Sequence, residues 1–194
     1  MHALGKNRLE GFSDGVVAII ITIMVLELKV PHDASAQALL QLTPVFLSYA
    51  LSFLVVAIIW VNHHHLLHTL THVSGRLLWL NNHLLFWLSL VPFTTSWIGK
   101  SHGAPMPTAV YGGVLLLAAI AYTILQTAIV AHQGPQSKLA AAVGKDRKGK
   151  VSMLAYALAI PLAYANPWLA DALYVFVALL WLVPDRRIES KLAS

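Results

Sequence analysis

The sequence predicts an all-α integral membrane protein with six membrane-spanning helices. Hydrophobic residues make up 58% of the chain and charged residues only 11%, against about 25% charged residues in ordinary soluble domains. Several apolar runs approach or exceed roughly 20 residues, the length that a helix needs to cross the hydrocarbon layer. The basic residues also fall mostly on one side of the predicted spans. We expect a single domain over residues 1–194, because no internal repeat or low-complexity linker divides the chain.

The six predicted spans are separated by short polar or breaker-rich segments. They cover residues 7–30, 36–72, 76–99, 107–132, 150–165 and 168–184. Pro44 lies inside the second span and should kink it or mark its effective start. The longest polar stretch precedes the fifth span, and we expect a loop there. The last two spans are short and joined by Asn166-Pro167, as in a tight hairpin.

The first span is polar at one end and apolar at the other. Residues 9–30 extend about 33 Å as a helix, enough to cross a bilayer. The first third carries Glu10, Ser13 and Asp14 next to Arg8, whereas the remainder is almost wholly apolar. An ionisable group in a spanning segment is costly and usually faces the bundle interior, a water path or a partner. This helix is therefore poorly explained as a simple anchor.

The predicted spans divide the Lys and Arg residues unevenly between the two sides of the membrane. One side carries Lys6, Arg8, Arg76, Lys138, Lys145, Arg147, Lys148, Lys150, Arg186, Arg187 and Lys191. The other side carries only Lys29 and Lys100. This bias predicts that both termini are cytosolic and that the excess charge faces membrane lipid. Nucleic acid is not an expected partner, since this topology signal accounts for the net charge of +5.

An apolar stripe runs along the first helix. At about 100° per residue, Ile19, Ile23, Leu26 and Val30 share one face, with Thr22 at its edge. On spacing alone, such a stripe favours packing against neighbouring helices.

A long ungapped motif opens this helix: Arg8-x-x-x-Phe12-Ser13-Asp14, followed by an apolar run to Pro31. It resembles the signature first helix of the transmembrane protein 175 family, the endolysosomal potassium channel and its prokaryotic homologues. Further segments fit the family, namely Trp60-Val-Asn62-His-His64, Asn81-Asn82 and Pro92-Phe93. A single six-helix repeat is the prokaryotic form. The resemblance therefore implies a multi-pass protein of a prokaryotic cell (inner) membrane.

The resemblance further implies a homotetramer in which four first helices line a central pore, conducting K⁺ in preference to Na⁺. Ile19, seven residues after Phe12, would form a narrow apolar constriction that closes by excluding water. Thr22 would offer a ring of hydroxyls to a passing K⁺. Leu26 would continue the lining, with Ile23 between them. Monovalent cations are the expected permeant partners and no cofactor is implied. The chain has no TVGYG sequence to build a carbonyl filter.

The motif residues are expected to join the inner end of the first helix to other helices. We expect Asp14 to be buried in the bundle, with Arg8 offsetting its charge. The candidate donors to Asp14 are Trp60, Asn62, His64, Asn81, Asn82 and His83. Gly11 and Gly15 would allow close helix approach. Glu27, near the outer mouth, is a further aid to cation preference.

Ten histidines leave two alternative functions open. His64, His68 and His72 share a helical face, and imidazoles at this spacing bind Zn²⁺ or Ni²⁺, so a histidine-rich divalent-metal transporter is one alternative. A proton-conducting channel is the other, since histidine titrates near neutrality and family members are associated with proton passage. An enzyme is not expected, because the chain has no cysteine, no HExxH and no Gly-x-Ser-x-Gly motif.

Overall fold

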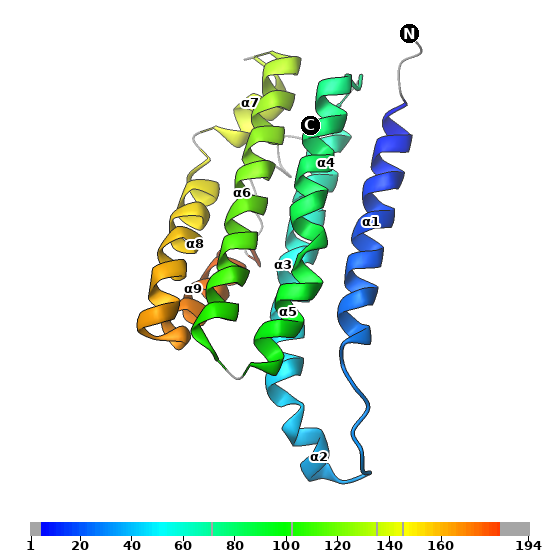
Figure 1. The fold of residues 1–194 in the computed structure, drawn as a ribbon. Coiled ribbons are helices and arrows are strands. Elements are labelled where there is room, and N and C mark those ends of the chain that lie inside the picture. Colours follow the sequence, from blue (N-terminus) through cyan, green and yellow to red (C-terminus); the bar gives the residue numbers. More distant parts are fainter. Residues whose placement is uncertain (1–4, 71, 102, 135, 145, 183–194) are drawn as a thin grey trace.

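The structure, a computed structural model, describes residues 5–70, 72–101, 103–134, 136–144 and 146–182 (Figure 1). Within these ranges the chain forms nine helices and no strand, which confirms the all-α prediction. The helices are α1 (Lys6–Leu26), α2 (Ala36–Gln41), α3 (Thr43–His68), α4 (Gly75–Ser89), α5 (Val91–Lys100), α6 (Pro105–Gln133), α7 (Lys138–Val143), α8 (Arg147–Ala165) and α9 (Pro167–Leu182). Both chain termini, predicted to be cytosolic, lie outside the described residues.

Two of the predicted spans are interrupted, each time two residues before a proline. The second breaks at Leu42, so that Pro44 lies in the first turn of α3, as predicted. The third, predicted as one helix over 76–99, breaks at Leu90, and Pro92 lies in the first turn of α5. Proline has no N–H and its ring crowds the carbonyl group four residues earlier, so a helix is interrupted at such a place.

Other helix ends differ from the prediction by a few residues. α1 ends at Leu26, before the predicted end. The polar stretch between α6 and α8, predicted as a loop, contains α7, and α8 begins at Arg147. Asp146 adopts a left-handed conformation with φ 40° and accepts a hydrogen bond from the Gly149 N–H at 3.1 Å. The capping carboxylate accepts from an amide that would otherwise be unpaired, and its negative charge interacts favourably with the positive end of the helix dipole. α8 therefore begins before the predicted residue 150.

α6 is the most extensively packed helix, in contact with α4, α5, α8 and α9 (Figure 1). Small side chains on it, among them Ala118 and Ala121, are buried and permit close helix approach. Gly112 faces the Tyr174 side chain, whose hydroxyl donates to the carbonyl oxygen of Thr108 at 2.8 Å. Any side chain at position 112 would displace this hydroxyl, so glycine is required where α6 meets α9.

α1 lies at the edge of the bundle and packs on one side against α3, α4 and α5 (Figure 1). The starts of α1 and α4 and the ends of α3 and α6 lie at one end of the bundle. The α1–α2 and α5–α6 connections lie at the other end, with Lys29 and Lys100. The fold therefore separates the described cations in the way the predicted spans do.

Three of the described helices are long and apolar enough to cross a membrane, judged by length and composition: α1, α3 and α6. α9 is apolar but shorter. The fourth, fifth and sixth spans of the sequence-based topology correspond to α6, α8 and α9, and the third to α4 with α5. The count of six spans remains a prediction.

Candidate functional site

α1 has one buried face and one exposed face. Its buried side chains are Leu9, Ser13, Val17, Ile20 and Met24, which recur every three or four residues. This is the repeat of one side of a helix, and it faces the neighbouring helices α3, α4 and α5. Packing of this face orients α1 and thereby decides which of its residues point away from the subunit.

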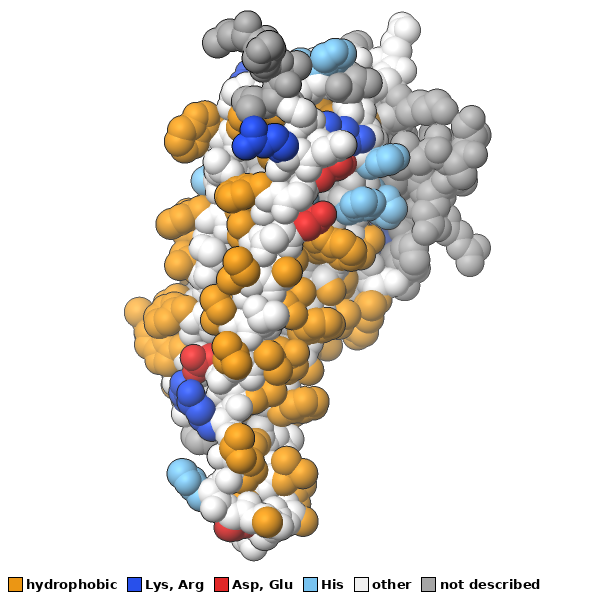
Figure 2. Space-filling model, turned by 90° about the vertical axis from the view of Figure 1, so that its right-hand side faces the viewer, with side chains coloured by type: hydrophobic (Ala, Val, Ile, Leu, Met, Phe, Trp, Pro, Cys, Tyr) orange, Lys and Arg blue, Asp and Glu red, His pale blue; other side chains and the backbone are white. Residues whose placement is uncertain are grey.

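The four residues predicted to line an ion pathway are exposed on α1. Ile19, Ile23 and Leu26 leave 59%, 45% and 73% of their surface accessible, and Thr22 is also exposed. Figure 2 looks onto this edge of the subunit, whose middle is covered by apolar side chains. The Thr22 hydroxyl donates to the carbonyl oxygen of Ile19 at 2.9 Å. Its oxygen therefore keeps lone pairs that can coordinate a cation.

A buried hydrogen-bond network joins α1 to α3 and α4 at the motif. The Asn81 Nδ2 donates to Ser13 Oγ at 3.0 Å, and Ser13 Oγ donates to the Leu9 carbonyl oxygen at 2.9 Å. The Asn81 Oδ1 lies 2.7 Å from His63 Nε2. An amide oxygen can only accept, so His63 carries its proton on Nε2. Ser13, His63 and Asn81 are at most 3% exposed, so each relies on the others for hydrogen bonding.

His63 is a member of this network that the sequence prediction missed. The prediction named its neighbours Asn62 and His64 but did not name His63. Its place on α3 was nevertheless available: it follows the buried Val56 by two turns and precedes the buried Leu66 by one turn. The periodicity of buried apolar positions, extended into the polar end of the helix, would have found it.

Asp14 is not buried within the subunit, and that prediction is wrong. It is exposed and accepts a hydrogen bond from Trp60 Nε1 at 2.9 Å. Trp60 is one of the predicted donors. Adjacent helical positions point about 100° apart, so with Ser13 facing the subunit core Asp14 must turn away from it.

Arg8 and Phe12 do not join α1 to another helix of the subunit. Both are exposed, Phe12 to 57%. Neither ion pair among the described residues includes Arg8, so it does not offset the charge of Asp14 through a direct contact. At this end of α1 it is Lys6 that pairs with Glu10 at 3.7 Å and donates to the carbonyl oxygen of His68 at 2.6 Å.

The remaining predicted partners also lie outside the Ser13 network. The Asn62 side chain donates to the Ile58 carbonyl oxygen of its own helix at 2.8 Å. His64 stacks on His68, with ring centroids 6.1 Å apart. Asn82 is exposed. None of these side chains is a hydrogen-bond donor to Asp14 among the described contacts.

Gly11 and Gly15 face open space. A Cβ atom at either position would meet nothing within 4 Å of the described chain. The predicted close helix approach at these glycines therefore does not occur inside the subunit. A helix that packs against them must come from another chain.

Glu27, directly after α1, is tied to α5. Its Oε2 accepts hydrogen bonds from Lys100 Nζ and Ser96 Oγ, both at 2.8 Å. The Lys100 bond, and then the Ser96 bond, hold the pKa of Glu27 below its ordinary value of 4.5. The Glu27 charge is thus offset by Lys100, which weakens the expectation that it attracts cations to the outer mouth.

Lys100→Gln should lower the free energy of unfolding by about 0–1 kcal/mol at neutral pH, because the ion pair is largely solvated. A lowered carboxyl pKa contributes stability above the ordinary pKa, and this contribution disappears as the pH falls through the folded-state value. Thermal unfolding in detergent over a series of pH values, from 7 down through the acid range, measures the difference. Lys29→Gln is the comparison: Lys29 does not bond Glu27 and acts on its charge only through space, as the smallest of the causes, so its effect should be smaller. A Lys100→Gln effect that persists in acid would contradict this account.

The histidines considered as a metal site occupy different environments. His63 is buried and bonded to Asn81, whereas His64 and His68 are stacked in the last two turns of α3. Over the described ranges, no group of three or more His, Cys, Asp or Glu residues is placed to hold a metal ion.

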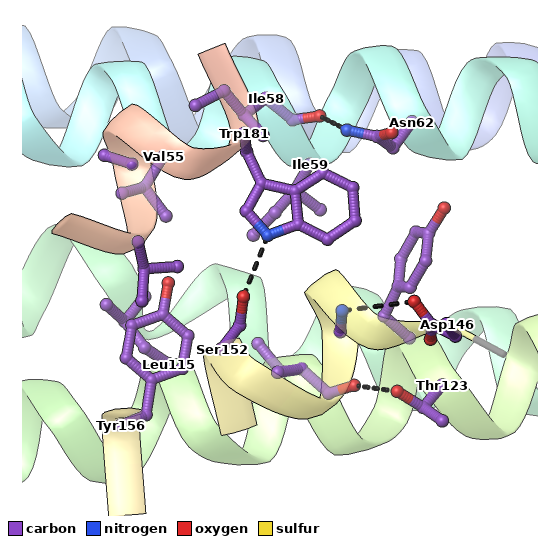
Figure 3. Close-up of a pocket in the computed structure, with 16 residues that line it drawn as sticks. Val55, Ile58, Ile59, Asn62, Leu115, Thr123, Asp146, Ser152, Tyr156 and Trp181 are labelled. Carbon is purple, nitrogen blue, oxygen red and sulfur yellow. Dashed lines mark hydrogen bonds between the residues drawn. The ribbon is translucent and has the colours of Figure 1, made fainter. Parts of the chain in front are cut away.

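A small cavity of ≈ 70 Å³ lies between α3, α6, α8 and α9 (Figure 3). Its wall is largely apolar, with Val55 at one side and Asp146 at the other. Within it Trp181 Nε1 donates to Ser152 Oγ at 2.9 Å. α1 contributes no residue to this cavity, so it is separate from the predicted ion pathway.

Residues 8–92 match a family model described as endosomal/lysosomal potassium channel TMEM175. A potassium channel of Chryseobacterium sp. (strain P1-3) is 52% identical over 187 residues, which are 96% of this chain and 97% of that protein. The endosomal/lysosomal proton channel TMEM175 of Gallus gallus is 28% identical over 146 residues, 67% of this chain and 29% of that protein.

The fold is also similar to a solved structure. The crystal structure of a lysosomal potassium-selective channel TMEM175 homolog from Chamaesiphon minutus matches with a TM-score of 0.81 and 28% sequence identity. The match covers 93% of this chain and 97% of that chain.

Proposed function

The chain belongs to the TMEM175 family of ion channels, and we propose that it is a potassium-selective cation channel of a prokaryotic inner membrane. Ions pass downhill through a pore enclosed by four copies of α1. The whole chain, residues 1–194, acts as one channel domain in each subunit, without a cofactor.

The observation that carries this proposal is the exposed face of α1. Ile19, Thr22, Ile23 and Leu26 point away from their own subunit, on a helix at the edge of the bundle (Figure 1). One helix cannot enclose a path, whereas four such faces around an axis can. The free face thus has the position and composition that a pore lining needs.

Conduction follows from the chemistry of these four side chains. A ring of Ile19 side chains closes the path by dewetting, without any charge, and their displacement opens a column of water. The Thr22 oxygens replace part of the hydration shell of a transient K⁺. Because there is no carbonyl filter, preference for K⁺ over Na⁺ should be weaker than in channels that use TVGYG loops.

Purified protein in liposomes tests the function. With a K⁺ gradient and no coupling ion, it should carry K⁺ downhill, and planar bilayers should show unitary currents. Reversal potentials in mixed KCl and NaCl should indicate preference for K⁺. Slow, saturable flux that needs a divalent metal would contradict the channel proposal and favour the divalent-metal transporter.

Proton conduction is the second candidate, favoured by the proton-channel name of the Gallus gallus relative. A pH-sensitive dye inside the same liposomes, under a pH gradient without K⁺, measures it. Acidification that matches protein-free vesicles would exclude it.

The proposed tetramer can be tested at the glycines of α1 that face open space. Native mass measurement in detergent should find four times the 21.2 kDa of one chain. Gly15→Leu should weaken or abolish the tetramer without unfolding the subunit. Its side chain has room in the subunit, whereas a second α1 that packs against the glycine would be pushed away. Gly113→Leu also enters open space, but on α6, and should leave the tetramer intact. A conducting monomer would defeat the pore proposal.

The proposed topology has six spans, with both termini and α7 on the cytosolic side. Since the chain has no cysteine, single cysteines report their side without background. We expect Gln136→Cys, in an exposed position before α7, to be protected from a membrane-impermeant thiol reagent added to intact cells. Ala34→Cys, exposed before α2, should be labelled. The reverse pattern would invert the topology.

A further inference from the structure

A groove of ≈ 460 Å³ lies on the bundle surface between α4 and α6. The first turn of α4 forms one wall and the last three turns of α6 form the other. The residues that matter for its chemistry are Arg76, Leu77, Ile124, Ala128, Ala131 and His132. We name this depression the α4–α6 groove. It contains no residue of α1 and is separate from the proposed pore.

The groove is mainly apolar along its length and basic at one end. Thr123 and Thr127 also line it, and their hydroxyls donate to carbonyl oxygens of α6 itself. Ile124, Ala128 and Ala131 recur every three or four residues, so they form one continuous strip on α6. Arg76 and His132, both exposed, lie where this strip ends at the start of α4 and the end of α6. Such a gradient matches an amphiphile with an apolar tail and a negatively charged head.

The basic end has no acidic counterpart in the described part of the chain. The lining of the groove includes no Asp or Glu. The two ion pairs among the described residues are Lys6–Glu10 and Lys100–Glu27, so neither engages Arg76. Arg76 is the second residue of α4, where the positive end of the helix dipole adds to its charge. An anion is therefore the expected partner of this guanidinium.

The position of the groove indicates that the bound anion is a membrane lipid. Its basic end coincides with the end of the bundle where α1 and α4 begin and α3 and α6 end (Figure 1). In the proposed topology this end meets the cytosolic leaflet, whose anionic lipids attract basic pockets between helices.

We propose that the α4–α6 groove binds one anionic phospholipid, with an acyl chain along Ile124 and Ala128 and the phosphate at Arg76. A guanidinium offers two parallel N–H donors to phosphate oxygens, a geometry that an ammonium group lacks. This site assignment rests on the proposed topology, and not on conduction.

Native mass spectrometry tests it directly. The purified channel in detergent is mixed with equal amounts of phosphatidylglycerol and phosphatidylcholine of identical chains, and retained lipids are counted. Wild type should retain phosphatidylglycerol preferentially. In Arg76→Gln the ratio of retained phosphatidylglycerol to phosphatidylcholine should fall about fivefold. This factor corresponds to about 1 kcal/mol for one basic residue near anionic lipid.

Matched variants separate the groove from general surface charge and from folding. Arg147→Gln removes an exposed cation of α8 outside the groove and should keep the preference. Ala131→Phe should fill the groove and reduce retention of both lipids, whereas Ala157→Phe, exposed on α8, should not. Equal retention of the two lipids by wild type, or equal losses in Arg76→Gln and Arg147→Gln, would overturn the proposal. Lipid retention is measured without ion flow. A failure of the lipid-site proposal can therefore be distinguished from a failure of the protein to conduct ions.

Discussion

Replacing Ile19 with asparagine is expected to raise the K⁺ current of the assembled channel about tenfold, the factor that corresponds to lowering the barrier by about 1.4 kcal/mol. If four Ile19 side chains close the path, the barrier arises from excluding water. Asparagine has the same number of side-chain heavy atoms as isoleucine, but its amide lets the ring hold water. Planar-bilayer recording at matched tetramer density measures the current. Discrimination between K⁺ and Na⁺ should be equal or weaker.

Two further asparagine substitutions on α1 separate a pathway residue from a packing residue. Val25 is 43% exposed but lies about 120° around the helix from Ile19, so Val25→Asn should leave the current unchanged. Ile20 is 3% exposed, and asparagine there should reduce the yield of folded protein. Equal currents from wild type and Ile19→Asn would contradict the proposed constriction. Ile19 would then be a packing residue, because a polar side chain there would not change conduction.

Asn81→Leu is expected to destabilise the folded chain by about 1–3 kcal/mol, because it leaves buried partners unsatisfied. Leucine has the same branching and the same number of side-chain heavy atoms as asparagine, so the change mainly tests hydrogen bonding. It removes the bonds from Asn81 to Ser13 and His63 and leaves the imidazole without this partner in the helix interface. Denaturant unfolding in detergent, together with the yield of assembled protein, measures the loss.

Asn82→Leu is the matched control, since it makes the same chemical change one residue along the same helix. Asn82 is exposed, and its substitution should change the free energy of unfolding by no more than about 0.5 kcal/mol. If both leucine variants are equally stable, the hydrogen bonds of Asn81 contribute nothing measurable beyond packing. The network would then not be what joins α1 to α3 and α4.

Prediction from the sequence was most successful where structure depends on local pattern. The break before Pro44 follows from the missing N–H of proline, and the equivalent break before Pro92 would have followed from the same rule. The relative directions of Ile19, Thr22, Ile23 and Leu26 follow from the helical repeat alone. The repeat does not say which side of α1 meets its own subunit, and an apolar stripe in a membrane helix suits either side.

The motif shows where local pattern stops being sufficient. Ser13 and Asp14 are adjacent polar residues, and both were expected in the network that anchors α1. The inner face of α1 includes Ser13, so the aspartate turns outward to Trp60. His63 replaces the predicted Asn62 and His64 as the partner on α3 because the buried face of α3 passes through it.

The sequence by itself determined that this chain is helical and membrane-embedded in character, approximately where its helices lie, and how its cations are divided along them. These properties depend on composition and on spacings of a few residues. Only the tertiary structure decided that Ser13 bonds to Asn81, 68 residues away, and that Glu27 bonds to Lys100, 73 residues away. Such pairs form when helices pack at a particular rotation and depth, and no single helix contains that information.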